Sequence, residues 1–238
     1  MTALQALVLA ALQGATELFP VSSLGHAVLL PALAAWHFDQ AAPIFLPFLV
    51  MLHLGTAAAL LVYFRAEWWL IALGVLGTGG AHQVHESRRV FLLIVVATVP
   101  AVIIGLALQH FIARLFGTPA AAALFLIANG ALLLAGERLR GRSGRALDAL
   151  TPRDALFIGL WQCLAFLPGI SRSGATMVGG LARGIDHEDA AHFSFLIATP
   201  VILGAGVLEV PKLLRAGVPQ DAFGIAVMAA IAAGITAF

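Results

Sequence analysis

Four long apolar stretches constrain the fold of this chain more than any other feature. The hydrocarbon core of a bilayer is about 30 Å thick, and a helix needs about 20 apolar residues to cross it. Stretches of about this length occupy Pro43–Phe64, Val90–Ile112, Pro119–Gly136 and Ala190–Val210. A fifth apolar run begins near Ala222 and continues to Phe238, where we interpret the chain as cut short. The sequence therefore predicts an all-α, polytopic membrane protein that forms one domain, residues 1–238.

The composition excludes several other classes of protein. Hydrophobic residues make up 61% of the chain and charged residues 11%, whereas soluble domains carry about 25% charged residues. This excludes a soluble enzyme, a disordered chain and a DNA-binding protein. The net charge is only +1, so we expect no nucleic-acid partner. A single cysteine, Cys163, excludes an intramolecular disulfide and a cysteine-based zinc site.

Two further apolar regions, residues 3–36 and 154–182, are interrupted by clusters of Pro, Gly and Ser. Non-helical backbone at membrane depth is tolerated only inside the protein or beside a water-filled cavity. Broken segments at corresponding places in two halves of a membrane protein point to a binding site. We therefore predict that each region is a re-entrant helix–loop–helix hairpin.

The two interrupted regions also resemble each other. Gln, Pro, Ser and Gly recur in the same order at a shift of 148 or 149 positions, beginning with Gln13 and Gln162. A repeated order of this kind indicates an internal duplication. We expect a first half at residues 1–136 and a second at 154–238, joined by an Arg-rich cytoplasmic loop at 137–153.

The basic residues predict the orientation, because cytoplasmic loops carry an excess of Lys and Arg. With the Arg-rich loop inside, alternating spans place nine basic residues in the cytoplasm and three outside. The nine are Arg65, Arg88, Arg89, Arg138, Arg140, Arg142, Arg145, Arg153 and Arg183, and the three are Arg114, Lys212 and Arg215. Spans 43–64 and 190–210 then run in opposite directions. The halves would form an inverted-topology repeat, with hairpins that meet near the bilayer midplane.

The most notable titratable side chains inside the interrupted regions are Glu17 and His26 in the first and Arg172 in the second. A charge at the bilayer centre costs about 2.5–3.5 kcal/mol on insertion scales, so such residues need partners and are functional by default. If the hairpins meet, these groups converge with five hydroxyls. The hydroxyls belong to Ser22, Ser23, Ser171, Ser173 and Thr176.

The segment 168–174 is typical of a phosphate-binding loop. The guanidinium of Arg172 matches two phosphate oxygens at once, and a Ser/Gly-rich helix start presents backbone N–H groups to an anion. Gly174 would allow close approach of the backbone. The alternative interpretation is a helix break whose arginine reaches toward the membrane surface.

Gln13 and Glu17 are four residues apart and share one helix face. Their oxygens could hold a hard cation such as Mg²⁺, or Glu17 could instead orient the ring of His26. His26 could attack phosphorus, act as a base for a neighbouring hydroxyl or protonate a leaving phosphate, and the sequence does not choose among these. We interpret His53 as a pore or packing residue and Asn129 as an interhelical hydrogen-bond former.

Two long motifs stand in the interrupted regions. The first combines Gln13 and Glu17 with the run Pro20–His26, and the second is Pro168–Thr176. In order and in content they resemble the bacterial undecaprenyl-diphosphate phosphatase family. Further similarity lies at residues 98–100 and 193–200.

The resemblance implies that the chain hydrolyses the terminal phosphate of a C55 isoprenyl diphosphate in a bacterial plasma membrane, with a site that opens to the periplasm. It implies functional roles for Glu17, Ser23, His26 and Arg172, and a divalent cation, Mg²⁺ or Ca²⁺, associated with activity. The phosphate-binding set would be Ser22, Ser171, Ser173, Gly174 and Thr176. Gln13 stands where a second carboxylate is common in the family, which weakens any mechanism with two carboxylates on one metal.

The main alternative is a secondary transporter or polyprenyl-phosphate flippase. Inverted repeats, broken helices and a midplane anion site suit alternating access equally well, and release of inorganic phosphate would separate the two. PAP2-type lipid phosphatases are excluded, because Val178 stands where their second histidine would follow Ser171. The expected partners are the undecaprenyl diphosphate substrate and membrane lipid. The sequence leaves open whether the protein forms a homodimer.

Overall fold

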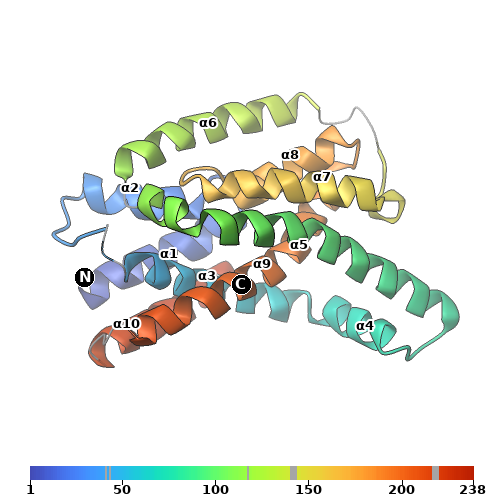
Figure 1. The fold of residues 1–238 in the computed structure, drawn as a ribbon, viewed down its shortest axis with the longest axis horizontal. Helices are drawn as coiled ribbons and strands as arrows, with labels where there is room; N and C mark the ends of the chain where they lie inside the picture. The colour runs from blue at the N-terminus through green and yellow to red at the C-terminus, as the bar shows by residue number, and fades with distance from the viewer. Residues whose placement is uncertain (41, 43, 117, 140–143, 216–219) are drawn as a thin grey trace.

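The computed structural model describes residues 1–40, 42, 44–116, 118–139, 144–215 and 220–238. Every regular element in these ranges is a helix, which confirms the predicted all-α class (Figure 1). Arg140 and Arg142, which contribute to the predicted orientation, lie outside the described residues, as does Pro43 at the start of the first predicted span.

Four of the described helices are long and apolar enough to cross a membrane. They are α3 (Phe45–Tyr63), α5 (Ala81–Phe116), α6 (Pro119–Glu137) and α9 (His187–Arg215). These helices confirm the four predicted spans. α5 and α9 extend well beyond the apolar stretches into polar sequence, because a helix that has nucleated can continue wherever no residue breaks it.

Two shorter helices complete the apolar part of the molecule. α4 (Arg65–Val75) has 11 residues, so it is too short to cross alone, as its sequence predicts. α10 (Gln220–Ala237) forms from the fifth apolar run and packs against α1 and α3. Small residues allow the close contact of α3 and α10: a Cβ atom on Gly55 would lie 1.8 Å from the carbonyl oxygen of Ala230. Close backbone approach through small residues is the usual packing mode of membrane helices.

Each interrupted region forms a helix, a loop and a second helix. The first contains α1 (Ala3–Glu17) and α2 (Ser23–Leu33), and the second contains α7 (Pro152–Gln162), the 3₁₀ turn η2 (Cys163–Phe166) and α8 (Arg172–Ala182). Thr2 and Thr151 start α1 and α7 with capping boxes, which satisfy otherwise unpaired N–H groups at a helix start.

The loops that break these regions contain strained or permissive backbone. Ser22 has a φ of 67°, which is uncommon for a residue with a side chain. Gly169 has a φ of 110°, which glycine adopts without strain. α6 packs against both α2 and α8, so the two loops come to the same part of the molecule.

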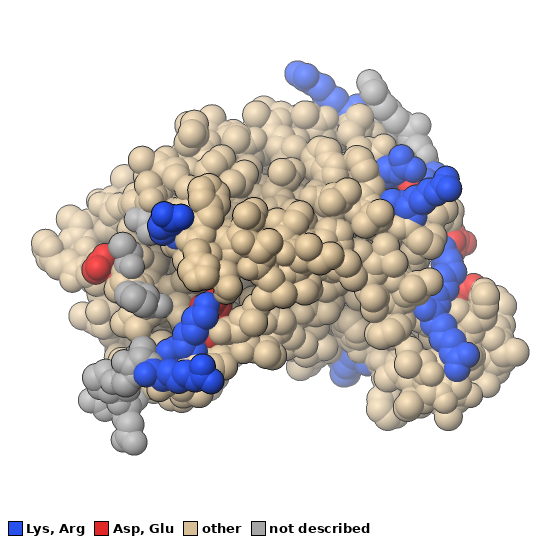
Figure 2. All heavy atoms as spheres, in the orientation of Figure 1, with Lys and Arg blue, Asp and Glu red and all other residues tan. Residues whose placement is uncertain are grey.

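On the face that Figure 2 shows, charged side chains lie mostly toward the ends of the molecule. In the view of Figure 2, Lys and Arg side chains gather near the two ends of the long axis, with an almost uncharged band between them. Large apolar side chains are exposed in α5 and α6, for example Ile103 at 61% and Ile127 at 74%. A contiguous exposed apolar band is unfavourable in water and matches a membrane protein.

One end of the molecule is held by a buried carboxylate. Asp154 at the start of α7 is 1% exposed and pairs with Arg183 at 2.6 Å and Arg145 at 3.0 Å. Thr151 donates to the same carboxylate through its backbone N–H and its hydroxyl. Burial raises the pKa of Asp154, but the hydrogen bonds from Arg183, Thr151 and Arg145 outweigh it and hold that pKa well below its ordinary value.

Candidate active site

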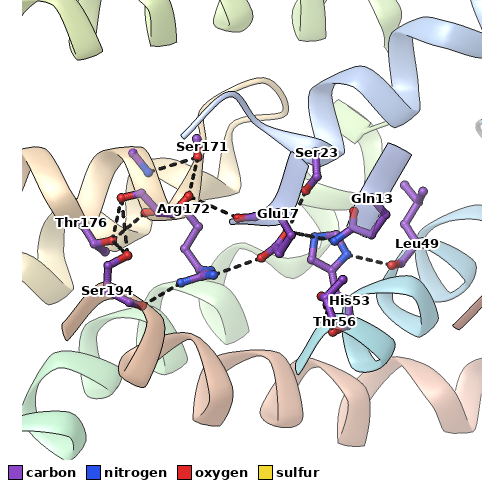
Figure 3. Close-up of polar contacts among 12 residues, drawn as sticks. Gln13, Glu17, Ser23, Leu49, His53, Thr56, Ser171, Arg172, Thr176 and Ser194 are labelled. Atoms are coloured by element: carbon purple, nitrogen blue, oxygen red, sulfur yellow. Dashed lines mark hydrogen bonds and ion pairs between the residues drawn. The ribbon is translucent and has the colours of Figure 1, made fainter. Parts of the chain in front are cut away.

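Glu17 is the centre of a buried polar cluster that joins the two motifs (Figure 3). It is the last residue of α1 and is 6% exposed. Its Oε2 accepts hydrogen bonds from Gln13 Nε2 at 2.9 Å and from Ser23 Oγ at 2.8 Å. The spacing of Gln13 and Glu17 therefore produces the shared helix face that the sequence predicts.

Arg172 reaches Glu17 from the second motif. Its Nη2 lies 3.0 Å from Glu17 Oε1 in a buried ion pair, and its Nη1 donates to the carbonyl oxygen of Ser194 in α9 at 3.1 Å. The side chain of Arg172 is 12% exposed. Breaking such a buried pair leaves an uncompensated charge, so each side chain supplies the counter-charge that the other needs in the interior.

The hydroxyls of the second motif surround the start of α8. Ser171 is the N-cap and accepts a hydrogen bond from the backbone N–H of Gly174 at 3.1 Å. Its hydroxyl also lies 3.0 Å from that of Ser173. Thr176 contacts the hydroxyl of Ser194 at 2.6 Å. A capped helix start of this kind presents its positive end to an anion.

Two glycines and one asparagine join the motifs. A Cβ atom on Gly25 would lie 2.6 Å from the Cα of Gly169, so the two loops touch backbone to backbone. Asn129 of α6 donates to the carbonyl oxygen of Pro20 at 3.0 Å and accepts from the N–H of Ser171 at 2.9 Å. The predicted interhelical hydrogen bond of Asn129 is thus a bridge between the two motif loops.

Gly174 permits a close contact of the backbone, but the partner in that contact is another part of the protein instead of a bound anion. A Cβ atom there would lie 3.2 Å from the carbonyl oxygen of Pro20 and 3.1 Å from Leu133. The glycine therefore serves the packing of one motif against the other.

A cavity of about 510 Å³ opens beside this cluster. Its polar end contains six residues from the two motifs, namely Glu17, Ser22, Ser23, Ser171, Arg172 and Ser173. Its walls come from α3, α5, η2 and α9 and are mostly apolar, with the polar exceptions His53, Gln109 and Glu209. The shape offers a charged end for a polar group and an apolar channel for an attached tail.

His26 is not among the residues that line the cavity, although it is hydrogen-bonded to one of them. Its ring is half-buried, and Nδ1 lies 2.7 Å from the carbonyl oxygen of Ser22. The structure thus brings Glu17, Ser23 and Arg172 together at the cavity and holds the imidazole beside Ser22.

The structure adds three residues to the cavity or the cluster, which the sequence did not connect with Glu17 or Arg172. One of them, His53, was interpreted as a pore or packing residue, and its place at the cavity agrees with the first of these. His53 of α3 lines the cavity, and its Nε2 lies 3.5 Å from Glu17 Oε2. Gln162 also lines the cavity, and Ser194 binds Arg172 through a backbone carbonyl. The duplication did mark Gln162, as the counterpart of Gln13. A carbonyl contact such as that of Ser194 has no signal in the sequence.

The fold and the site together define a class, a helical membrane protein with an arginine and a carboxylate at the head of an apolar cavity. The chain belongs to the family described as Bacitracin resistance protein BacA, whose sequence profile matches residues 6–238.

Relatives with curated names agree with this family. The chain is 59% identical to a protein of Granulibacter bethesdensis named "Undecaprenyl-diphosphatase", over 100% of this chain and 85% of that protein. It is also 59% identical to a protein of the same name from Acidiphilium cryptum, with 100% and 86% covered. A third, from Gluconacetobacter diazotrophicus, is 56% identical, with 100% and 85% covered.

Proposed function

We propose that this protein is an enzyme that hydrolyses undecaprenyl diphosphate to undecaprenyl phosphate and inorganic phosphate. One observation carries the proposal: Glu17, Ser23 and Arg172 meet at the polar head of an otherwise apolar cavity. A diphosphate needs cationic, hydrogen-bonding partners, and a prenyl chain needs an apolar channel. The names of the relatives supply the substrate that combines both groups.

Arg172 binds the diphosphate in this proposal. A guanidinium can hold two phosphate oxygens and offset the negative charge that develops during phosphoryl transfer. The hydroxyls and N–H groups at the start of α8 lie beside it and complete the anion site. Ser22, Ser171, Ser173 and Thr176 form this set with the backbone at Gly174.

Glu17 acts as the general base. Its Oε2 already accepts the hydroxyl hydrogen of Ser23 at 2.8 Å, which is the distance required for proton transfer. As the proton moves to Glu17, the Ser23 oxygen, or a water in its place, attacks the terminal phosphorus. Attack by water gives inorganic phosphate directly, whereas attack by Ser23 gives a phosphoserine that a water must then hydrolyse to release inorganic phosphate and restore the hydroxyl. The bond from that phosphorus to the bridging oxygen breaks, and the lipid monophosphate leaves. We assign protonation of this leaving group to His26 on the strength of its motif.

A divalent cation, Mg²⁺ or Ca²⁺, is part of the proposal. The Oε1 atom of Gln13 is buried without a hydrogen-bond partner, and it lies on the same helix face as Glu17. These two residues would hold the cation together with substrate oxygens, as Mg²⁺ sites commonly do. The bound cation would offset the negative charge of the diphosphate.

The membrane placement is likewise proposed. The helix–loop–helix regions are re-entrant hairpins of an inverted repeat, which is supported by the direct contact of their loops at Gly25 and Gly169. The protein lies in the bacterial plasma membrane with its Arg-rich loop in the cytoplasm and its site open to the outside. That the protein can form a homodimer is likewise part of the proposal.

Phosphate release from a C55 diphosphate by purified protein in detergent tests the function. We expect release by the parent and a loss of about 10²–10³-fold for Arg172→Ala. Arg215→Ala, at an exposed end of α9, is the matched control and should retain parent activity. Absence of release from folded parent, with Mg²⁺ and Ca²⁺ each supplied, would contradict the enzyme. Lipid movement across vesicles without phosphate release would instead support a transporter.

A further inference from the structure

A second apolar groove lies beside the candidate active site. Its volume is about 250 Å³, and it forms where α5 packs against α4 and α9 (Figure 1). The side chains that line it are apolar or aromatic except for Thr98, whose hydroxyl donates to the carbonyl oxygen of Ile94 at 2.7 Å. Because that hydroxyl is already satisfied, the groove suits a hydrocarbon chain better than a polar head.

The groove continues the cavity of the candidate active site. Val102 of α5 lines both spaces. On α9, Pro200 lines the groove and the next residue, Val201, lines the cavity. The two spaces are therefore parts of one furrow between α5 and α9, with Val102 at the junction.

The groove lies at the depth of the hydrocarbon and faces the lipid. Phe91 and Val102 both line it and are eleven residues apart, which is about 16 Å along a helix that rises 1.5 Å per residue. Both belong to the apolar stretch Val90–Ile112. Val95 and Val99, between them, are 40% and 44% exposed, so a chain can enter the groove from the bilayer as well as from the cavity.

The substrate of the proposed function is larger than the cavity. Cavities of about 300–1,000 Å³ enclose drug-sized ligands, so one of about 510 Å³ holds a diphosphate and only the first part of a C55 chain. Lipid tails are as apolar as the groove, which gives the groove no hydrophobic advantage over the bilayer. A head bound at Arg172 instead holds the tail nearby and raises its effective concentration at the groove.

We propose that the groove between α4, α5 and α9 is a binding subsite for the distal part of the prenyl chain, which enters it past Val102. The inference rests on the proposed function, because it takes the diphosphate to be held at Arg172. A chain in the groove gains close packing against the protein. Long-chain diphosphates should therefore be used better than short ones, and the groove should supply part of that preference.

Filling the groove tests whether its occupancy contributes to turnover. Val99→Trp places an indole in the groove, and Leu92→Trp is the matched control, because Leu92 is 52% exposed on the same helix but lines neither space. We expect Val99→Trp to lower kcat/KM for a C55 diphosphate by about ten-fold and for a C15 diphosphate by less than about two-fold. Leu92→Trp should match the parent with both. Parent-like use of the C55 substrate by Val99→Trp, or an equal loss with both substrates, would overturn the proposal.

A fluorescence measurement locates the tail without any need for turnover. Trp68 lines the groove, whereas its neighbour Trp69 is 66% exposed and does not line it. Two variants each retain one of these two as the sole tryptophan, with the others replaced by Phe, in nanodiscs of phosphatidylcholine. The probe is a C55 monophosphate with bromine near the end of its tail, since bromine quenches an indole that it contacts. We expect saturable quenching of Trp68, little quenching of Trp69, and loss of the saturable part when Arg172→Ala is added.

Equal quenching of Trp68 and Trp69 would contradict the subsite. Quenching of Trp68 that Arg172→Ala leaves unchanged would also contradict it, because the groove would then take any chain from the surrounding lipid. If the parent releases no phosphate, the proposed function fails, while the quenching still decides whether the groove holds the tail of a bound prenyl phosphate.

Discussion

Two carboxylates of this protein are buried beside arginines, but they differ in what surrounds them. Asp154 receives hydrogen bonds from Arg145, Arg183 and Thr151 and borders no described cavity. Glu17 pairs with Arg172 at the edge of an open cavity. The Asp154 cluster ties the chain near residue 145 to α7 and α8, and Asp154 lines neither of the two described cavities. The open space beside the Glu17–Arg172 ion pair, more than its burial, distinguishes a site that can bind a ligand from a cluster that only stabilises the fold.

The largest expected effect is the loss of activity when the Glu17 carboxylate is replaced. Glu17→Gln preserves the size of the side chain but removes the base, so we expect kcat to fall by about 10²–10⁴-fold. KM should fall or stay constant, because the carboxylate no longer competes with phosphate oxygens for Arg172. Steady-state phosphate release measures both constants. Retained kcat in a folded variant would show that another group is the base.

Asp154→Asn removes the carboxylate at the centre of the second cluster and should lower the stability of the fold instead of the catalytic rate. Removal of one partner from a buried ion pair costs about 3–5 kcal/mol, and the partial exposure of both arginines, 34% and 43%, reduces this to about 1–3 kcal/mol. Thermal unfolding in detergent measures the loss. Activity per folded molecule should equal that of the parent, and a selective loss of activity would contradict the structural role.

The cavity can be filled without disturbing its polar head. Gly204 lines the cavity, and a Cβ atom there meets nothing within 4 Å. Gly204→Leu should therefore fold normally and weaken the use of a C55 substrate by about ten-fold in kcat/KM, with less effect on a short prenyl diphosphate. Gly224→Leu in α10 is the matched control, since Gly224 is equally open but lies away from the cavity. Equal kinetics for the two variants would place the prenyl chain elsewhere.

The smallest effect is a pH dependence of stability that comes from Asp154. Its pKa is lowered in the folded state, so its contribution is present above the unfolded value of about 3.9 and disappears as pH falls toward the folded value. The difference in Tm between the parent and Asp154→Asn should thus be constant near neutral pH and shrink below about pH 4. A difference that grows on acidification would reverse the sign of this account.

The sequence predicted the membrane class and the motifs well, for identifiable physical reasons. An apolar run of about 20 residues has few alternatives to a membrane helix, so α3, α5, α6 and α9 could be predicted directly. Glu17 and Arg172 were visible because a charge inside an apolar run is costly, and their convergence, though not their ion pair, followed from the expectation that the two motif loops meet.

The contacts that His53, Gln162 and Ser194 make with the site could not be predicted, because they depend on packing between distant helices. His53 stands in an ordinary apolar span, and only the approach of α3 to α1 brings it to Glu17. The carbonyl oxygen of Ser194 and the side chain of Gln162 enter the site through α9 and α7 in the same way. The placement of His26 beside Ser22 follows from the turn at Ser22, which periodicity does not reveal.

The most direct test compares one conservative substitution at each ion pair. Arg172→Lys and Arg183→Lys both retain the positive charge and remove the planar fork. Phosphate release per folded molecule and Tm are measured for both. The account predicts that Arg172→Lys loses about 10²-fold or more of its activity with a small change in Tm, and that Arg183→Lys retains activity with a lowered Tm. Activity retained in Arg172→Lys and lost in Arg183→Lys would contradict it.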